Sequence, residues 1–218
     1  MATTRRGART RWRCALGAVF AAVCGWTTPS DAAGMPKATL VISEIFADPA
    51  LVSDAAGEFI EFVNLTPGPI ALAKIQIQTP SGRLLAVTSK RKHVESGGVV
   101  VVRPSASRRP RRMNSGGSAS RHVEGVATGM RLPNRAGRVA LLWRGRVVDV
   151  AQWWPRWPWP KPRAGRSLSR VSPAADGRYG RSWRHETKPL RVVERASPGA
   201  HRWSCKQLRK AGVNQCPQ

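Results

Sequence analysis

From residue 38 onward the chain alternates short apolar runs with turn-forming residues. The runs are rich in Val, Ile and Leu, and Gly, Pro, Asn or Ser residues separate them. None has a sustained helical period, and so many short runs of this kind predict an all-β sandwich or barrel. The predicted strands cover residues 39–46, 58–64, 70–78, 83–88, 99–103, 138–143 and 146–151, with a short edge strand at 165–171.

Two of these regions carry a finer pattern. Residues 58–63 (Glu-Phe-Ile-Glu-Phe-Val) alternate in part, which predicts a strand with one buried face. Only Arg144 and Gly145 separate the runs 138–143 and 146–151. A two-residue connection between two strands predicts a tight hairpin.

A basic segment, residues 104–122, interrupts the strands. It contains no acidic residue and no large aliphatic side chain beyond Met113, so it cannot bury enough apolar surface to order itself. We expect a mobile basic loop inserted in the sandwich. From Pro155 onward Pro and Arg become frequent, and regular structure is hard to assign. The candidate anion-binding residues of the loop are Arg108, Arg109, Arg111, Arg112 and Arg121.

Residues 1–32 have the pattern of a signal peptide. Five arginines precede an uncharged, largely apolar stretch at residues 14–26, and small residues follow at 30–33. Cleavage is expected after Ala32 or Ala33. A transmembrane anchor is the alternative, but about 13 apolar residues fall short of the ~20 that span a bilayer.

Export by the general route is favoured over two other kinds of signal. The pair Arg5-Arg6 lacks the hydrophobic residues that follow a twin-arginine motif, and Val23 stands where a lipoprotein signal prefers a small residue before its cysteine. We therefore expect a secreted, periplasmic or cell-envelope protein without a membrane span after cleavage.

Cleavage would leave two of the four cysteines, Cys205 and Cys216. Two neighbouring cysteines in an exported chain favour a disulfide, with two free thiols in a C-terminal tail as the alternative. The bridge would close a loop of about 12 residues and stabilise the fold by ~2–3 kcal/mol.

Several short motifs follow one another in a distinct order along the chain. They are residues 41–49, 57–64, 66–72, 132–134, 139–143, 144–149, 157–158, 165–168 and 197–200, together with Trp183. Their order resembles the lamin-tail domain, an immunoglobulin-like module also found in exported bacterial proteins. This resemblance implies an immunoglobulin-like β-sandwich over about residues 38–200, followed by a tail at 201–218, and implies binding or scaffolding rather than catalysis. Phe59 stands where the family usually has Trp, Ala73-Lys74 replaces Gly-Trp, and the segment 104–122 resembles an insertion.

Five of the twelve acidic residues form the only acidic cluster in the sequence: Glu44, Asp48, Asp54, Glu58 and Glu61. Their oxygens could bind a hard cation such as calcium. A compact Asp-rich loop is absent, however, and residues 58 and 61 fall on opposite faces of an ideal strand. We therefore favour strand-face carboxylates paired with some of the many arginines, and predict no metal site.

The segment 152–161 is unusually rich in tryptophan and proline. Trp153, Trp154, Trp157 and Trp159 lie among cationic residues and could stack on bases or sugars. The alternative is that they pack over an open edge of the sandwich, which the prolines keep from pairing. We favour packing for most of them, with one or two left exposed.

The chain is strongly basic. It holds 37 Lys and Arg against 12 Asp and Glu, a formal net charge of +25. Such a charge favours anionic partners, either an envelope surface or polymer or extracellular DNA. The four scattered histidines have no metal-ligand spacing, and no nucleophile elbow, phosphate-binding loop or dinucleotide fingerprint occurs, so we predict neither enzyme nor cofactor.

The sequence therefore predicts a non-catalytic exported module that contacts anionic polymers or the envelope through its arginine-rich loop. The alternative is a carbohydrate- or ligand-binding module that uses the tryptophans of residues 153–159.

Overall fold

A computed structural model describes residues 39–105, 122–161, 163–188, 196–199 and 203–213. The chain divides into two units, residues 1–34 and 35–218, and all described residues belong to the second. The predicted signal peptide, the five arginines of the basic loop and Cys216 lie outside the described residues. These predictions stay predictions.

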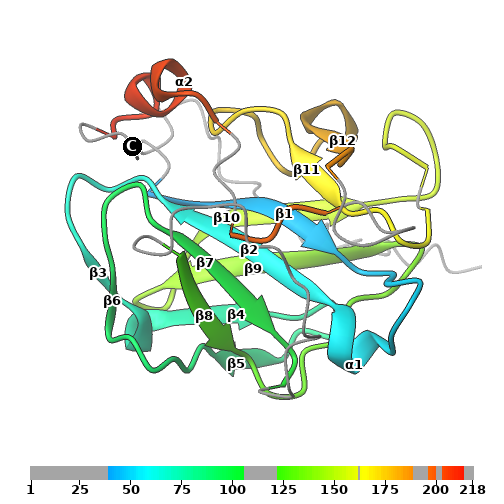
Figure 1. Cartoon of the computed structure of the whole chain (residues 1–218), viewed down its shortest axis with the longest axis horizontal. Coiled ribbons are helices and arrows are strands. Elements are labelled where there is room, and N and C mark those ends of the chain that lie inside the picture. The colour runs from blue at the N-terminus through cyan, green and yellow to red at the C-terminus, as the bar shows by residue number, and fades with distance from the viewer. Residues whose placement is uncertain (1–38, 106–121, 162, 189–195, 200–202, 214–218) are drawn as a thin grey trace, which may run out of the picture. The chain divides into compact units, whose positions relative to one another are not determined.

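The larger of the two main sheets has six strands. It runs in the order β12 (Trp183–His185), β11 (Leu168–Arg170), β1 (Leu40–Phe46), β2 (Phe59–Asn64), β7 (Val99–Arg103) and β8 (His122–Val126) (Figure 1). All neighbours are antiparallel except β7 and β8, which are parallel and pair Val99 with His122 and Arg103 with Val126. The connection through residues 104–121 therefore joins opposite ends of two adjacent strands.

The second sheet has four antiparallel strands, and smaller elements complete the fold. Its order is β10 (Arg146–Trp153), β9 (Gly137–Trp143), β4 (Ile75–Gln78) and β5 (Leu84–Ala86). A third, two-stranded sheet pairs β3 (Ile70–Ala71) with β6 (His93–Val94). The helical elements are α1 (Asp54–Gly57), η1 (Leu72–Lys74), η2 (Gly180–Ser182) and α2 (Cys205–Lys210).

The main core fills the space between the two large sheets. The six-stranded sheet contributes Ile42, Phe62 and Val100, and the four-stranded sheet contributes Ile77 and Leu141, all in one buried cluster. Burying apolar side chains between two facing sheets is what holds such an architecture together. The prediction of an all-β sandwich is confirmed.

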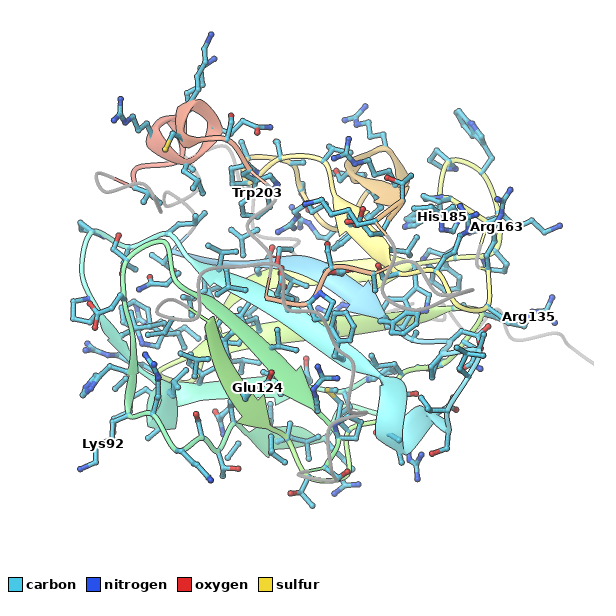
Figure 2. All side chains as sticks on the ribbon, viewed as in Figure 1. Lys92, Glu124, Arg135, Arg163, His185 and Trp203 are labelled. Atoms are coloured by element: carbon cyan, nitrogen blue, oxygen red, sulfur yellow. The ribbon has the colours of Figure 1, made fainter. Side chains whose placement is uncertain are left out.

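The six-stranded sheet is also covered on its outer side. Trp203, Leu208 and Val213, from α2 and its flanks, pack with Val41 and Val63 in a second buried cluster (Figure 2). Every residue of β1 and of β2 is consequently buried. The prediction of one buried face for residues 58–63 is therefore wrong, because the C-terminal segment shields the other face.

Several element boundaries differ from the sequence prediction. The run 70–78 is divided into β3, η1 and β4, because the chain turns at Leu72–Lys74 and passes from the two-stranded sheet to the four-stranded one. The segment 165–171 is not an edge strand, since its core β11 lies between β1 and β12. Arg144 and Gly145 both have positive φ, 52° and 75°, as the predicted hairpin turn requires.

A buried ion pair ties the two large sheets together. The Arg170 guanidinium on β11 donates to both carboxylate oxygens of Asp149 on β10, over 2.6 and 2.9 Å, and Arg170 is 1% exposed. The same carboxylate accepts from the Ile42 amide at 2.7 Å, next to a register shift in β1. Asp149 therefore satisfies a backbone donor beside this irregularity in the strand.

The buried acids of β1 and β2 accept hydrogen bonds from the polypeptide that covers them. Glu44 accepts from the Ser167 hydroxyl and, at 3.0 Å, from the Ser197 amide. Glu61 accepts from the Ser43 hydroxyl at 2.6 Å and from the Gly199 amide at 2.7 Å. These carboxylates thus hold the segment 196–199 against the outer face of the sheet.

Candidate binding surface

The tryptophan-rich segment begins inside the core. Trp153, the last residue of β10, is 1% exposed, and its indole N–H donates to the Pro133 carbonyl at 2.8 Å. Trp159 is partly buried against the main core and donates to the Gln152 carbonyl at 3.2 Å. Both rings pack on the protein, and both indole donors are satisfied, as buried tryptophan requires.

Two other tryptophans of the segment face the solvent. Trp154 is 39% exposed and Trp157 is 90% exposed. A turn closed by the hydrogen bond from the Trp159 amide to the Arg156 carbonyl, at 3.0 Å, places Trp157 at its tip. The Arg156 guanidinium lies 5.8 Å from the centre of the Trp154 ring, within cation–π range.

A third exposed aromatic comes from a turn that packs against this segment. Gly180 lies so close to Pro158 and Trp159 that a Cβ there would fall 2.5 Å from their backbone. The preceding residue, Tyr179, is 49% exposed, and the Arg181 guanidinium lies 5.4 Å from its ring centre. We call this set the aromatic–arginine surface, comprising Trp154, Arg156, Trp157, Tyr179 and Arg181.

A small pocket, here named the Arg163 pocket, opens beside the base of the same segment. Its cavity measures about 20 Å³, and Trp153 and Leu168 form part of its wall. Its polar lining consists of Asp48, Asn134, Arg163 and Arg166. The Asn134 side-chain amide donates to the Asp48 carboxylate at 3.1 Å.

His185, on β12, lies next to this pocket, close to Arg163 in Figure 2. Burial lowers the pKa of its imidazole, and the cationic Arg163 and Arg166 lower that pKa further, against a hydrogen bond between the imidazole and the Lys161 carbonyl. Burial also raises the pKa of Asp48, with a smaller contribution from Asp54. The positive charge of this region therefore comes from its arginines and lysine rather than from histidine.

The ends of the predicted basic loop are anchored on the six-stranded sheet. Arg103, at the end of β7, pairs with Glu124 of β8 at 3.3 Å, and its guanidinium lies 5.6 Å from the Phe59 ring centre. Arg108, Arg109, Arg111, Arg112 and Arg121 lie outside the described residues.

Sequence reasoning identified the tryptophans but missed Tyr179 and Arg181. Their turn meets the tryptophan segment through the close packing of Gly180 on Pro158, a contact between segments about 20 residues apart. No local pattern in the sequence marks such a contact. Asn134 and Arg166 of the Arg163 pocket were missed for the same reason.

Other kinds of site find little support in the part of the chain that the structure describes. There, no three His, Cys, Asp or Glu side chains gather as a metal site would require. None of the described helices has the length and apolar character to cross a membrane. No protein-family model matches the chain, and no curated protein matches it.

Proposed function

We propose that the protein is a non-catalytic, exported binding module of the immunoglobulin-like, lamin-tail type that holds an anionic polymer. The placement of the resemblance motifs supports the fold assignment. Residues 59–64 form β2 beside β1, and residues 144–149 form the turn between β9 and β10 and the first part of β10. These two motifs lie in the two large sheets of the sandwich, which is compatible with the proposed fold type.

The aromatic–arginine surface is the observation that carries the proposed function. Single exposed aliphatic residues are ordinary, but aromatic rings exposed together on adjoining turns suggest an interaction site. An arginine lies over each of two of these rings, Trp154 and Tyr179. Rings and guanidinium groups arranged in this way bind charged polymers by stacking and by charge.

The charge of the surface points to an anionic ligand. Neither Arg156 nor Arg181 forms an ion pair with any residue that the structure describes. The whole chain carries a formal charge of +25. A negatively charged polymer would therefore be attracted over a distance and would release counterions on binding.

The first test measures the affinity of the purified protein for polygalacturonate and for an oligo-dT single strand. Trp157→Ala should weaken binding about tenfold or more, since stacking on an exposed ring contributes ~1–3 kcal/mol. Leu84→Ala is the matched control, because Leu84 is also exposed, at 52%, but lies on β5, at the edge of the four-stranded sheet opposite to β10. Equal affinities of the two variants for both polymers would refute the proposal.

The arginine-rich loop has its own test. Changing Arg108, Arg109, Arg111, Arg112 and Arg121 together to serine should reduce the slope of log affinity against log salt concentration, since each phosphate or carboxylate contact releases counterions. An unchanged slope would place the anion contacts elsewhere, on the aromatic–arginine surface. Affinity for a neutral polysaccharide with no salt dependence would instead support the alternative carbohydrate-binding module.

A further inference from the structure

The Arg163 pocket is held open by the local conformation of the chain. Residues 163–166 form a tight turn in which the Arg166 amide donates to the Arg163 carbonyl at 3.1 Å. Gly165 adopts a φ of +72°, which a residue with a side chain rarely adopts, and its amide donates to the Asp48 carbonyl at 2.7 Å. The turn is thereby fixed to the end of β1 with both arginines lining the cavity.

The cations of this pocket have no acidic partner in the described chain. No ion pair joins Arg163 or Arg166 to a described carboxylate, and His185 beside them has a lowered pKa. Two unpaired guanidinium groups at one cavity form a ready site for an oxyanion, which arginine binds through parallel N–H donors. The cavity, at about 20 Å³, suits a single small group rather than a whole ligand.

The other polar residues that line the pocket limit which chemical groups of a ligand can bind there. Asp48 contributes carboxylate oxygens, which accept hydrogen bonds and repel a bare anion. Asn134, whose amide donates to Asp48, contributes a side-chain oxygen that can also accept. A ligand that suits all four residues therefore presents an anion and also a hydroxyl donor. A uronate sugar has this combination, whereas the backbone of a DNA strand has no hydroxyl to donate.

The pocket and the aromatic–arginine surface are formed by adjacent parts of the chain. Trp153 lines the pocket and Trp154, the next residue, is exposed on the surface. Lys161, between Trp157 and Arg163, is bound through its carbonyl to the imidazole of His185 at 2.9 Å. A polymer chain lying across the exposed rings would therefore reach the pocket with a neighbouring unit.

We propose that the Arg163 pocket binds the carboxylate of a uronate unit while Asp48 accepts a hydrogen bond from a free ring hydroxyl of the same chain, so that the polymer held by this module is an acidic polysaccharide. This inference rests on the proposed function and specifies its ligand. Arg163 and Arg166 donate hydrogen bonds to the carboxylate of the ligand, and Asp48 accepts a hydrogen bond from its hydroxyl. The exposed aromatic rings pack on sugar units outside the pocket.

The test compares three probes: polygalacturonate, its methyl ester, and oligo-dT. The double change Arg163→Gln and Arg166→Gln should weaken polygalacturonate binding at least about tenfold, because charge-assisted hydrogen bonds are lost. The control, Arg83→Gln with Arg146→Gln, removes two charges from exposed positions outside the pocket, one just before β5 and one at the hairpin end of β10, and should have a much smaller effect. Methyl esterification should weaken binding to the wild type more than to the double variant.

The variant Asp48→Asn provides a second test of the proposal, because it retains the shape of the side chain and removes the charged hydrogen-bond acceptor. It should weaken polygalacturonate binding several-fold and leave oligo-dT binding unchanged or slightly stronger. Thermal unfolding of each variant checks that the fold is retained.

Two results would overturn the inference: equal losses in the pocket and control double variants, or equal affinity for polygalacturonate and its ester. Trp157→Ala separates this failure from that of the proposed function. If Trp157→Ala weakens both polymers while the pocket variants match their control, the binding surface stands and the uronate assignment fails.

Discussion

Arg170 is a charged side chain placed where almost every neighbour is apolar. It is fixed by two hydrogen bonds to Asp149 and lies 5.5 Å from the Trp183 ring centre. Gly177 packs directly on its guanidinium, so that a Cβ there would overlap it. At this site the stabilising contribution depends on both partners, since either charge alone would be buried without compensation.

Changing Arg170 to glutamine should therefore lower the free energy of unfolding by about 3–5 kcal/mol. Arg178→Gln is the matched control, because Arg178 pairs with Asp176 at 2.7 Å but is 42% exposed, and such pairs contribute only ~0–1 kcal/mol. Chemical denaturation followed by tryptophan fluorescence measures both. Similar losses in the two variants would contradict the structural role assigned to the buried pair.

Gly137 is restricted by a neighbouring ring. It pairs with Trp153 across β9 and β10, and a Cβ added there would overlap the indole. Gly137→Ala should destabilise the protein by ~1–3 kcal/mol through overpacking. Gly68→Ala, where nothing lies within 4 Å of the added carbon, should change the midpoint of denaturation little. A tolerated Gly137→Ala would show that the Trp153 ring can move.

Glu58 makes stability depend on pH. Burial raises the pKa of Glu58 from 4.5 to about 7, despite the opposing hydrogen bond from the Leu132 amide. The folded protein then binds the proton more tightly than the unfolded chain, so this stabilisation is complete below pH 4.5 and is lost as the pH rises through 7.

Glu58→Gln keeps an oxygen for the Leu132 amide and removes the ionisation. The free energy of unfolding of the variant, relative to the wild type, should increase as the pH rises from 4.5 to above 7. Denaturation at both ends of this range measures it, with exposed Glu95→Gln controlling for the lost charge. A difference that is constant with pH would exclude a raised pKa for Glu58.

At the level of elements, the apolar runs predicted most of the strands. β7 has the predicted bounds, and β1, β2, β5, β9 and β10 differ by no more than two residues at either end. Burial of both faces of β1 and β2 could not be predicted, because the cover comes from residues about 140 positions later. β8 and β12 were missed because they are short and carry polar residues.

Helix α2 was also missed, although its first turn carries a local signal. Ser204 and Gln207 form a capping box in which each side chain bonds the backbone of the other. The motif precedes only six helical residues, among which Leu208 alone is buried. The periodic pattern that follows the cap is too short for the sequence to predict a helix.

The role of α2 as a cover can be tested at its central side chain. Leu208 is fully buried against Val41, Val63 and Trp203. Leu208→Ala should lower the free energy of unfolding by about 2–5 kcal/mol, while exposed Lys206→Ala in the same helix should change it little. Equal stability of the two variants would mean that the helix is not needed to shield the sheet.

At the scale of the whole molecule, every described strand of the sandwich lies after the predicted signal peptide. The first strand begins at Leu40, and all described contacts lie within the second unit of the chain. A chain that begins at Ala33 should therefore show the circular dichroism spectrum and the unfolding midpoint of the full protein. A loss of cooperative unfolding would contradict the assignment of residues 1–32 as a segment outside the fold.

The sequence predicted only part of the candidate site, because contacts between distant segments of the chain decide which side chains stay exposed. Trp154 and Trp157 stand out as residue types, and prolines around them indicated an irregular segment. Which rings enter the core was decided by distant partners, such as the Pro133 carbonyl that binds Trp153. The Arg163 pocket similarly combines residues from four separate parts of the chain.

The parallel pairing of β7 with β8 has a practical consequence for engineering. A connection between such strands must return along the length of the strand. From Val99 to Arg103 this length is four residue steps, or ~13 Å. The topology thus requires a certain reach from residues 106–121 but no particular composition. A peptide epitope of equal length could be grafted there in place of the arginines, giving a scaffold for display on an unchanged sandwich.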